Sequence, residues 1–210
     1  MNPISYNDIN GLQTEKEVLI HAAQAGVRSI LLTGPVGCGK TMLARRFPTA
    51  MPPLSPQEAA EVGYVQGVCG LFSPRDVVRP FRAPHHTVSL VGLRGGGTPR
   101  PRPGEMSLAH AGVLYVEDVV EFPWFNLEAI QEAQKIRGVE VSVEKVIYRW
   151  PANFVLIATA NLCPCGYKGG RSQDRCRCQP KSIQRFQDRL EKVKALLNFD
   201  LVLNVDEYHL

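Results

Sequence analysis

The sequence predicts an α/β protein, with a parallel β-sheet flanked by helices, and three observations favour this class. Short apolar runs alternate along the chain with segments of helical spacing. A glycine-rich loop at residues 34–41 stands between one such run and the start of a helix. Hydrophobic residues make up 44% of the 210 and charged residues 21%, values near the average for globular proteins, which excludes a disordered or fibrous chain.

Individual elements follow from local patterns. Four apolar runs have the length and composition of strands buried in a parallel sheet, at residues 27–33, 111–116, 153–160 and 199–205. Helical spacing predicts three main helices, at residues 7–26, from Thr41 onward and at 125–136. The alternating stretch at 139–149 predicts the arm of a hairpin.

The stretch from residue 50 to 104 is rich in proline, glycine and arginine. Apart from a helical patch at 56–66 its periodicity is weak, so we expect a long insertion within one domain that covers residues 1–210. No apolar run approaches the roughly 18 residues of a membrane span. The N-terminus lacks a secretory signal, so we expect a cytoplasmic protein with no membrane partner.

Charge is distributed unevenly, although the net charge is only +4. Residues 75–104 hold six arginines against one acid, and residues 165–194 hold nine lysines and arginines against three acids. The intervening stretch 105–144 has eight acids against two bases. The two basic segments form either an ordinary solvated surface or a face that binds a polyanion.

Residues 34–41 match the phosphate-loop pattern in full. Glycines let successive backbone N–H groups face phosphates, Lys40 supplies a positive charge and Thr41 offers a hydroxyl to Mg²⁺. The helix that follows directs its positive end at the same anion. We therefore expect ATP to be contacted by Gly34, Pro35, Val36, Gly37, Cys38, Gly39, Lys40, Thr41 and Met42.

Acids at the end of a neighbouring strand complete such a site. Glu117 and Asp118 follow the run at 111–116, in the reverse of the common order of Asp then Glu. Glu117 would reach further toward the metal, and Asp118 less far toward the attacking water; alternatively, both acids merely cap the strand. Asn161 follows the run at 153–160, where its amide could orient water or sense the γ-phosphate.

Four of the six cysteines fall within sixteen residues, as two C-x-C pairs: Cys163, Cys165, Cys176 and Cys178. In a reducing cytosol such a cluster favours structural zinc, bound by four thiolates at about 2.3 Å. The alternative is four independent small hydrophobic residues, which a polar, glycine-rich segment disfavours. For the isolated Cys38 and Cys69 we expect packing roles, with Cys38 serving the loop only through its backbone.

A histidine pair, His85 and His86, stands in a stretch with interleaved arginines and aromatic residues, Phe72 and Phe81 among them. A metal role would need further ligands, so a loop or interface role is favoured. The arginines could contact nucleic acid or a neighbouring subunit.

Four sequence motifs together resemble the magnesium-chelatase-like ATPases of the ComM (YifB) family, within the AAA+ superfamily: GPVGCGKTMLARRFP, RPFRAPHHTVSLVG, PRPGEMSLAHAGVLYVED, and ATANLCPCGY followed by CRC. The resemblance runs from about residue 7 to residue 203. It implies a hexameric ring ATPase of the P-loop NTPase fold, acting in DNA branch migration on single-stranded or branched DNA.

The same resemblance implies roles for particular residues. Lys40 and Thr41 would be the Walker A pair, Glu117 and Asp118 the Walker B pair, and Asn161 sensor 1. Residues 62–109 would form the helix-2 insert, residues 139–153 the pre-sensor-1 hairpin, and residues 163–178 the cysteine loop.

The chain also departs from the family pattern. The Walker B acids are inverted, and Leu197 and Asn198 stand near the place of an Asp-Arg pair with the candidate arginine finger. We expect neither the helical lid domain with its second sensor nor the N-terminal Lon-protease-like domain. The leading hypothesis is a Mg-ATP-binding core with weak hydrolysis coupled to DNA. The alternatives are a catalytically weak adaptor for DNA or for a full-length AAA+ partner, and a chelatase-type motor.

Overall fold

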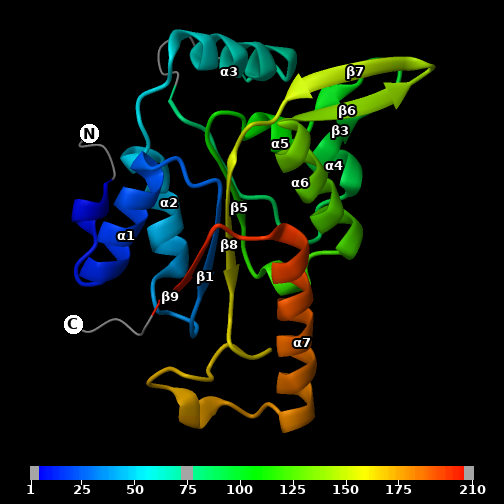
Figure 1. Cartoon of the computed structure of the whole chain (residues 1–210). Coiled ribbons are helices and arrows are strands. Elements are labelled where there is room, and N and C mark those ends of the chain that lie inside the picture. Colours follow the sequence, from blue (N-terminus) through cyan, green and yellow to red (C-terminus); the bar gives the residue numbers. More distant parts are fainter. Residues whose placement is uncertain (1–4, 72–77, 206–210) are drawn as a thin grey trace. The chain divides into compact units, whose positions relative to one another are not determined.

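The computed structural model describes residues 5–71 and 78–205 (Figure 1). The main sheet has five strands in the order β2-β5-β8-β1-β9. These strands are β1 (Ser29–Thr33), β2 (Phe81–Arg82), β5 (Val113–Val116), β8 (Val155–Ala160) and β9 (Leu201–Asn204). The pairs β1–β9 and β2–β5 are parallel, so the predicted α/β class with a parallel sheet is confirmed.

The chain divides into two compact units. Unit 1 takes its described residues from the stretches Met1–Pro52, Val116–Glu121 and Ile157–Leu210, and unit 2 from Pro53–Tyr115 and Phe122–Leu156. Each unit is described by itself below.

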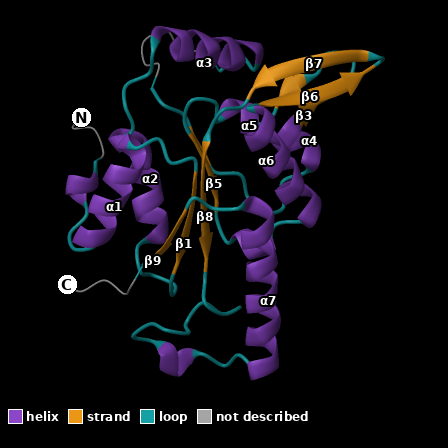
Figure 2. Cartoon of the chain, viewed as in Figure 1, coloured by secondary structure: helices purple, strands orange, loops and turns teal. Residues whose placement is uncertain are grey.

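Unit 1 contains most of the elements predicted around the glycine-rich loop. Its β1 pairs with β9 in parallel register, with Ile30 opposite Leu201 and Thr33 opposite Asn204 (Figure 2). The helices are α1 (Gln13–Gln24), α2 (Lys40–Ala50) and α7 (Pro180–Leu197), with single turns η1 (Tyr6–Asp8), η2 (Val119–Glu121) and η3 (Gln173–Arg175). The fully buried side chains of this unit include Leu19, Ile30, Leu31, Leu32, Leu43, Phe47 and Ile157.

Unit 2 contains the stretch expected to be an insertion. Its helices are α3 (Pro56–Val68), α4 (Leu90–Arg94), α5 (Glu105–Leu108) and α6 (Trp124–Ile136). The antiparallel pairs are β3 (Gly95–Gly96) with β4 (Arg102–Pro103), and β6 (Gly138–Val143) with β7 (Val146–Pro151). Figure 1 shows β6 and β7 as a long two-stranded ribbon, as the alternation at 139–149 predicts.

Two elements differ from the sequence-based expectation. The two-residue strand β2 lies inside the expected insertion, yet it pairs with β5 and so forms an edge of the main sheet. The 18-residue helix α7 follows the cysteine loop and was not predicted. Within the described residues, no helix combines the length and the apolar character needed to cross a bilayer.

Candidate functional site

The glycine-rich loop joins β1 to α2 in unit 1, in the order that the motif predicts. Gly34 has a φ of +153°, and a Cβ there would overlap the carbonyl oxygen of Val205 and lie 2.9 Å from Cys38 Sγ. Val205 in turn donates its N–H to the carbonyl of Thr33 at 2.7 Å. Any side chain at position 34 would therefore displace the loop from the last strand.

The side chain of Lys40 lies at the centre of the site, with 8% of the residue exposed. Its ammonium group donates to the carbonyl oxygens of Gly34 at 2.8 Å and Pro35 at 2.7 Å, and to Asn161 Oδ1 at 3.1 Å. Three oxygen acceptors thus match the three protons of the ammonium. Burial lowers the pKa of Lys40, because the charged form loses hydration.

Cys38 is buried in the packing role expected from the sequence, but its side chain also contacts Lys40, so its contribution is not confined to its backbone. Its side chain is fully buried, and its sulfur lies 3.7 Å from Lys40 Nζ. Burial raises the pKa of this thiol, which favours the neutral form beside the lysine. Cys38 therefore packs beneath the loop as a neutral group.

The two acids after β5 have different partners. Glu117 Oε1 accepts a hydrogen bond from the hydroxyl of Thr41 at 2.8 Å. Asp118 Oδ1 accepts from Asn161 Nδ2 at 2.9 Å, and the backbone N–H of Asp118 donates to Thr159 Oγ1 at 3.1 Å. Asp118 also has a φ of +48°, a left-handed conformation that Asp tolerates better than most residues. The structure therefore brings together all four residues predicted to be catalytic, Lys40, Glu117, Asp118 and Asn161.

A cavity of about 360 Å³ opens between the loop and these acids. Its lining combines the start of α2, a buried lysine and two carboxylates, in the residues Val36, Gly37, Gly39, Lys40, Thr41, Met42, Glu117, Asp118 and Thr159. The N-terminus of a helix together with a lysine attracts anions, whereas a carboxylate beside a hydroxyl suits a hard divalent cation. The cavity can therefore hold an anion and a cation side by side.

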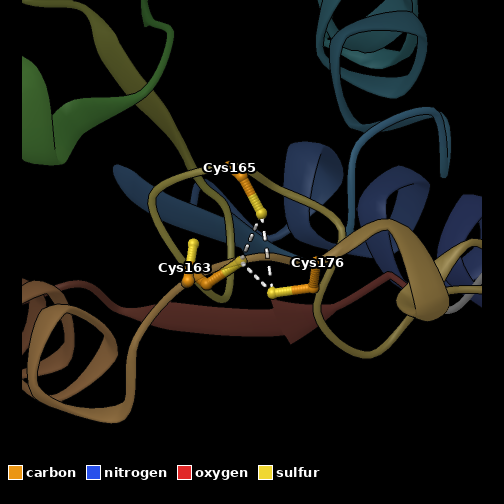
Figure 3. A group of neighbouring side chains, drawn as sticks. Cys163, Cys165 and Cys176 are labelled. Atoms are coloured by element: carbon orange, nitrogen blue, oxygen red, sulfur yellow. Dashed lines mark hydrogen bonds between the residues drawn. The ribbon is translucent and has the colours of Figure 1, made fainter.

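The four clustered cysteines converge in the loop after β8. Figure 3 shows three of them, Cys163, Cys165 and Cys176. The sulfur of Cys163 lies 3.5 Å from that of Cys165 and 3.8 Å from that of Cys176, and the Cys165 and Cys176 sulfurs are 3.6 Å apart. All four sulfurs, including that of Cys178, lie within 4.8 Å of one another. Tetrahedral zinc with bonds of about 2.3 Å places its sulfurs roughly 3.8 Å apart, so the donor set fits zinc in number, type and spacing.

Three arginines of the segment 75–104 form ion pairs within unit 2. Arg82 binds Glu105 through two hydrogen bonds of 2.7 Å, Arg79 lies 3.5 Å from Glu58 and Arg94 lies 3.2 Å from Glu132. Acids thus offset much of the positive charge of this segment. Phe72, which was grouped with these arginines, lies outside the described residues.

The two residues of the histidine pair contact each other and a neighbouring threonine. The rings of His85 and His86 are tilted by 38° with centroids 3.9 Å apart, and His85 Nδ1 lies 2.8 Å from Thr87 Oγ1. In the described part of the chain, the one group of metal-ligating side chains that converges is the cysteine cluster.

The segment 165–194 keeps its basic side chains exposed in unit 1. Seven of them belong to exposed residues, namely Arg171, Arg175, Arg177, Lys181, Arg185, Arg189 and Lys192. They lie on the cysteine loop and on α7. Of the two basic segments, this one therefore offers the better surface for a polyanion.

Two residues of the site were missed from the sequence. Thr159 is buried, lines the cavity and accepts the N–H of Asp118, but its place inside an apolar strand gave no functional signal. Gly166 accepts the N–H of Val36 at 2.9 Å and so joins the cysteine loop to the phosphate loop. Its position directly after Cys165 was the available signal for it.

Comparison with known proteins agrees with this geometry. Residues 5–209 match the protein family described as magnesium chelatase, subunit ChlI. The chain is 37% identical over 208 residues to the competence protein ComM of Haemophilus influenzae, covering 97% of this chain and 39% of that protein. It is 38% identical over 200 residues to the YifB protein of Salmonella typhimurium, covering 94% of this chain and 38% of that protein. The chain thus spans less than two fifths of these relatives.

A third relative and a solved structure are more distant. The magnesium-chelatase 67 kDa subunit of Chlorobaculum tepidum is 27% identical over 165 residues, covering 74% of this chain and 23% of that protein. The structure of NtrX from Brucella abortus in complex with ATP has a TM-score of 0.57 at 16% identity, covering 97% of this chain and 39% of that chain. This structural similarity supports the predicted fold class.

Proposed function

The chain belongs to the magnesium chelatase ChlI family, and on that premise we propose that it binds Mg²⁺-ATP through its phosphate loop. The observation that carries the proposal is the set of contacts around Lys40, whose ammonium joins the loop carbonyls to Asn161. A buried cation on the first turn of a helix is suited to the β- and γ-phosphates of a nucleotide, because the ammonium and the helix N-terminus both attract anions. The ATP-bound NtrX structure has the same fold.

Mg²⁺ fits the oxygen pair formed by Thr41 and Glu117. The hydroxyl and the carboxylate are hard donors that already lie 2.8 Å apart, and both line the cavity. When bound with the nucleotide, the ion supplies charge that offsets the negative phosphate oxygens. Glu117, the first acid, thus takes the metal position, and its longer side chain gives it the reach to do so.

We further propose that hydrolysis is slow. Asp118 is the carboxylate left to polarise water, and the amide of Asn161 holds it toward the lysine. Asn198, which stands near the place of a candidate arginine finger, ends α7 in a left-handed conformation. An arginine finger contributes roughly 10³- to 10⁵-fold in turnover. We therefore expect an asparagine at this place to slow ATP hydrolysis far more than it weakens ATP binding.

We propose that the four cysteines hold one structural zinc ion. Residues 162–179 contain a single three-residue helical turn, and most of their side chains are not buried. Such a segment lacks a hydrophobic core, whereas four convergent thiolates can order it around a metal. The close sulfur spacing supports this assignment.

DNA is the macromolecular partner that we propose. The support is the exposed basic surface on the cysteine loop and α7, and the similarity to ComM. Assembly into a ring of identical chains is part of the same proposal.

The second candidate function is a nucleotide-binding adaptor for DNA or for a longer AAA+ partner, which the inverted acids and Asn198 favour. A chelatase motor has less support, because identity to the chelatase subunit is lower.

Steady-state ATP turnover with Mg²⁺, measured with and without branched DNA, tests this function. The Lys40→Ala protein serves as the blank. A rate above the blank that rises with DNA supports a working motor core. ATP binding without turnover supports the adaptor, and a Lys40→Ala protein that binds ATP as tightly as the wild type overturns the proposed site.

A further inference from the structure

The cysteine loop and the phosphate loop are in direct contact through backbone atoms of unit 1. The N–H of Val36 donates to the carbonyl of Gly166 at 2.9 Å. Gly166 directly follows Cys165, and its own N–H closes a turn onto the carbonyl of Cys163 at 3.0 Å. The position of the acceptor for Val36 is therefore set by the turn that carries two of the four thiols.

Gly166 is the residue that permits this contact. Its φ is +81°, and a Cβ there would lie 3.2 Å from Val36 Cβ and 3.5 Å from Asn161 Cγ. The first distance is shorter than an ordinary van der Waals contact, and the second is near the lower limit of one. The turn therefore packs closely against the phosphate loop. Asn161, which binds both Lys40 and Asp118, lies against the same turn.

The turn has little besides the thiols to hold it. Between residues 164 and 179, Gly166 is the only buried residue, and η3 is the only regular element. A segment with so little apolar burial loses its order readily unless it is cross-linked. The sulfurs of Cys163, Cys165 and Cys176, 3.5 to 3.8 Å apart, provide the cross-link once a metal binds them.

We infer that a metal ion held by the four cysteines positions the phosphate loop through Gly166, so that metal and nucleotide bind cooperatively. The inference rests on the proposed function, since it needs both ligands to bind. Gly166 is a positioning residue in this scheme: it touches Val36, and Val36 lines the nucleotide cavity. Coupling of this kind typically changes affinity by about tenfold and is reciprocal, so ATP strengthens zinc binding by the same factor.

The test is a calorimetric titration of Mg²⁺-ATP into two forms of the full chain. One form carries one equivalent of zinc, and the other has been stripped with a chelator and desalted. We expect the dissociation constant for ATP to be about tenfold higher in the metal-free form. A second titration, of zinc into the stripped protein with and without ATP, should show the same factor.

Two variants locate the route of coupling. Gly166→Ala should keep its zinc, as measured by metal analysis, but lose most of the zinc dependence of ATP affinity. Gly169→Ala is the matched control, because Gly169 lies in the same loop with a φ of +83°, but a Cβ there would meet the end of the Leu162 side chain, at 2.8 Å from Cδ1, instead of the phosphate loop. This control should retain the wild-type dependence.

Each contrary result has a distinct meaning. Equal ATP affinity with and without bound zinc overturns the inference and leaves ATP binding standing. Failure of the wild type to take up zinc also overturns it. Full coupling in Gly166→Ala overturns the route through Gly166. Absence of ATP binding in both forms overturns the proposed function itself, and the inference with it.

Discussion

The hydroxyl of Thr41 donates a 2.8 Å hydrogen bond to Glu117 Oε1. This contact assigns different positions to the two inverted acids, because Asp118 instead accepts from Asn161. The first acid after β5 thus adjoins the hydroxyl of Thr41, and the second adjoins Asn161, the residue after β8. The inversion changes the reach of each side chain while keeping the arrangement of two carboxylates at the cavity.

Replacing Glu117 by Gln should weaken magnesium binding. The amide keeps the shape and can still accept from Thr41, but it removes the charged oxygen that a hard cation prefers. We expect the Mg²⁺ concentration for half-maximal nucleotide binding to rise on the order of tenfold, a loss of about 1.4 kcal/mol. Glu121→Gln, at an exposed position on η2, is the control and should change nothing. Unchanged Mg²⁺ dependence in Glu117→Gln would contradict the metal assignment.

Replacing Asn161 by Ala should reduce both stability and turnover. The change removes an acceptor from Lys40 and a donor from Asp118, and an unsatisfied buried group costs about 1 to 3 kcal/mol. The free energy of unfolding in urea and single-turnover hydrolysis measure the two effects. Asn153→Ala, at an exposed position just before β8, is the control. Wild-type values for Asn161→Ala would show that these contacts are dispensable.

Purified protein should contain about one zinc ion per chain. Changing Cys163 and Cys176 together to Ser should remove the metal and lower the melting temperature, because these sulfurs lie 3.8 Å apart in the cluster. Cys69→Ser alters a half-buried cysteine outside the cluster and should keep the metal. Metal analysis and thermal unfolding give the readouts. Folding of the metal-free double variant with unchanged melting would contradict a structural zinc.

Acid should destabilise unit 2 through Glu58. Its carboxylate accepts the N–H of Ser55 at 2.8 Å, which lowers the pKa of Glu58, and Arg79 adds to this effect. Because the folded pKa is below the unfolded one, the stabilisation is present above the ordinary glutamate pKa and is lost as the pH falls through the lowered one.

We therefore expect Glu58→Gln to cost only about 0.5 kcal/mol of unfolding free energy at pH 7, because glutamine can still accept from Ser55 and water screens the charge of this partly exposed side chain. The difference from wild type should shrink on acidification below pH 4, and urea unfolding at both pH values measures it. A difference in unfolding free energy that grows at low pH would show that folding does not lower the pKa of Glu58.

Removing charge from α7 should weaken DNA binding. Lys181 and Arg185 are exposed and one turn apart, so Ala at both positions removes two candidate phosphate contacts. The slope of log affinity against log salt should fall by roughly 1.4 to 1.8. Lys135→Ala, in the acidic segment, is the control. An unchanged slope would place the DNA surface elsewhere or support the adaptor with a protein partner.

Local patterns were sufficient to predict the core of the fold. Strand, glycine loop and helix at 29–50 follow from short-range chemistry, because the phosphate-loop pattern encodes its own turn. The cysteine cluster was also predictable, since four thiols in sixteen residues have few other uses.

Long-range contacts were not predictable in the same way. The strand β2 has two residues and no periodicity, and only its pairing with β5 makes it a strand. Helix α7 buries Leu190, Val193 and Leu197 at helical spacing, a signal that the many charged residues between them obscured. The contact of Gly166 with Val36 joins loops 130 residues apart and needs the fold itself.

The central claim is that Lys40 makes this chain a nucleotide-binding protein, and a calorimetric titration of Mg²⁺-ATP into wild type and Lys40→Ala tests it most directly. We expect saturable one-to-one binding by the wild type and loss of most of that affinity in the variant, with both proteins folded by circular dichroism. Equal affinity in the two proteins, or no binding by a folded wild type, would contradict it.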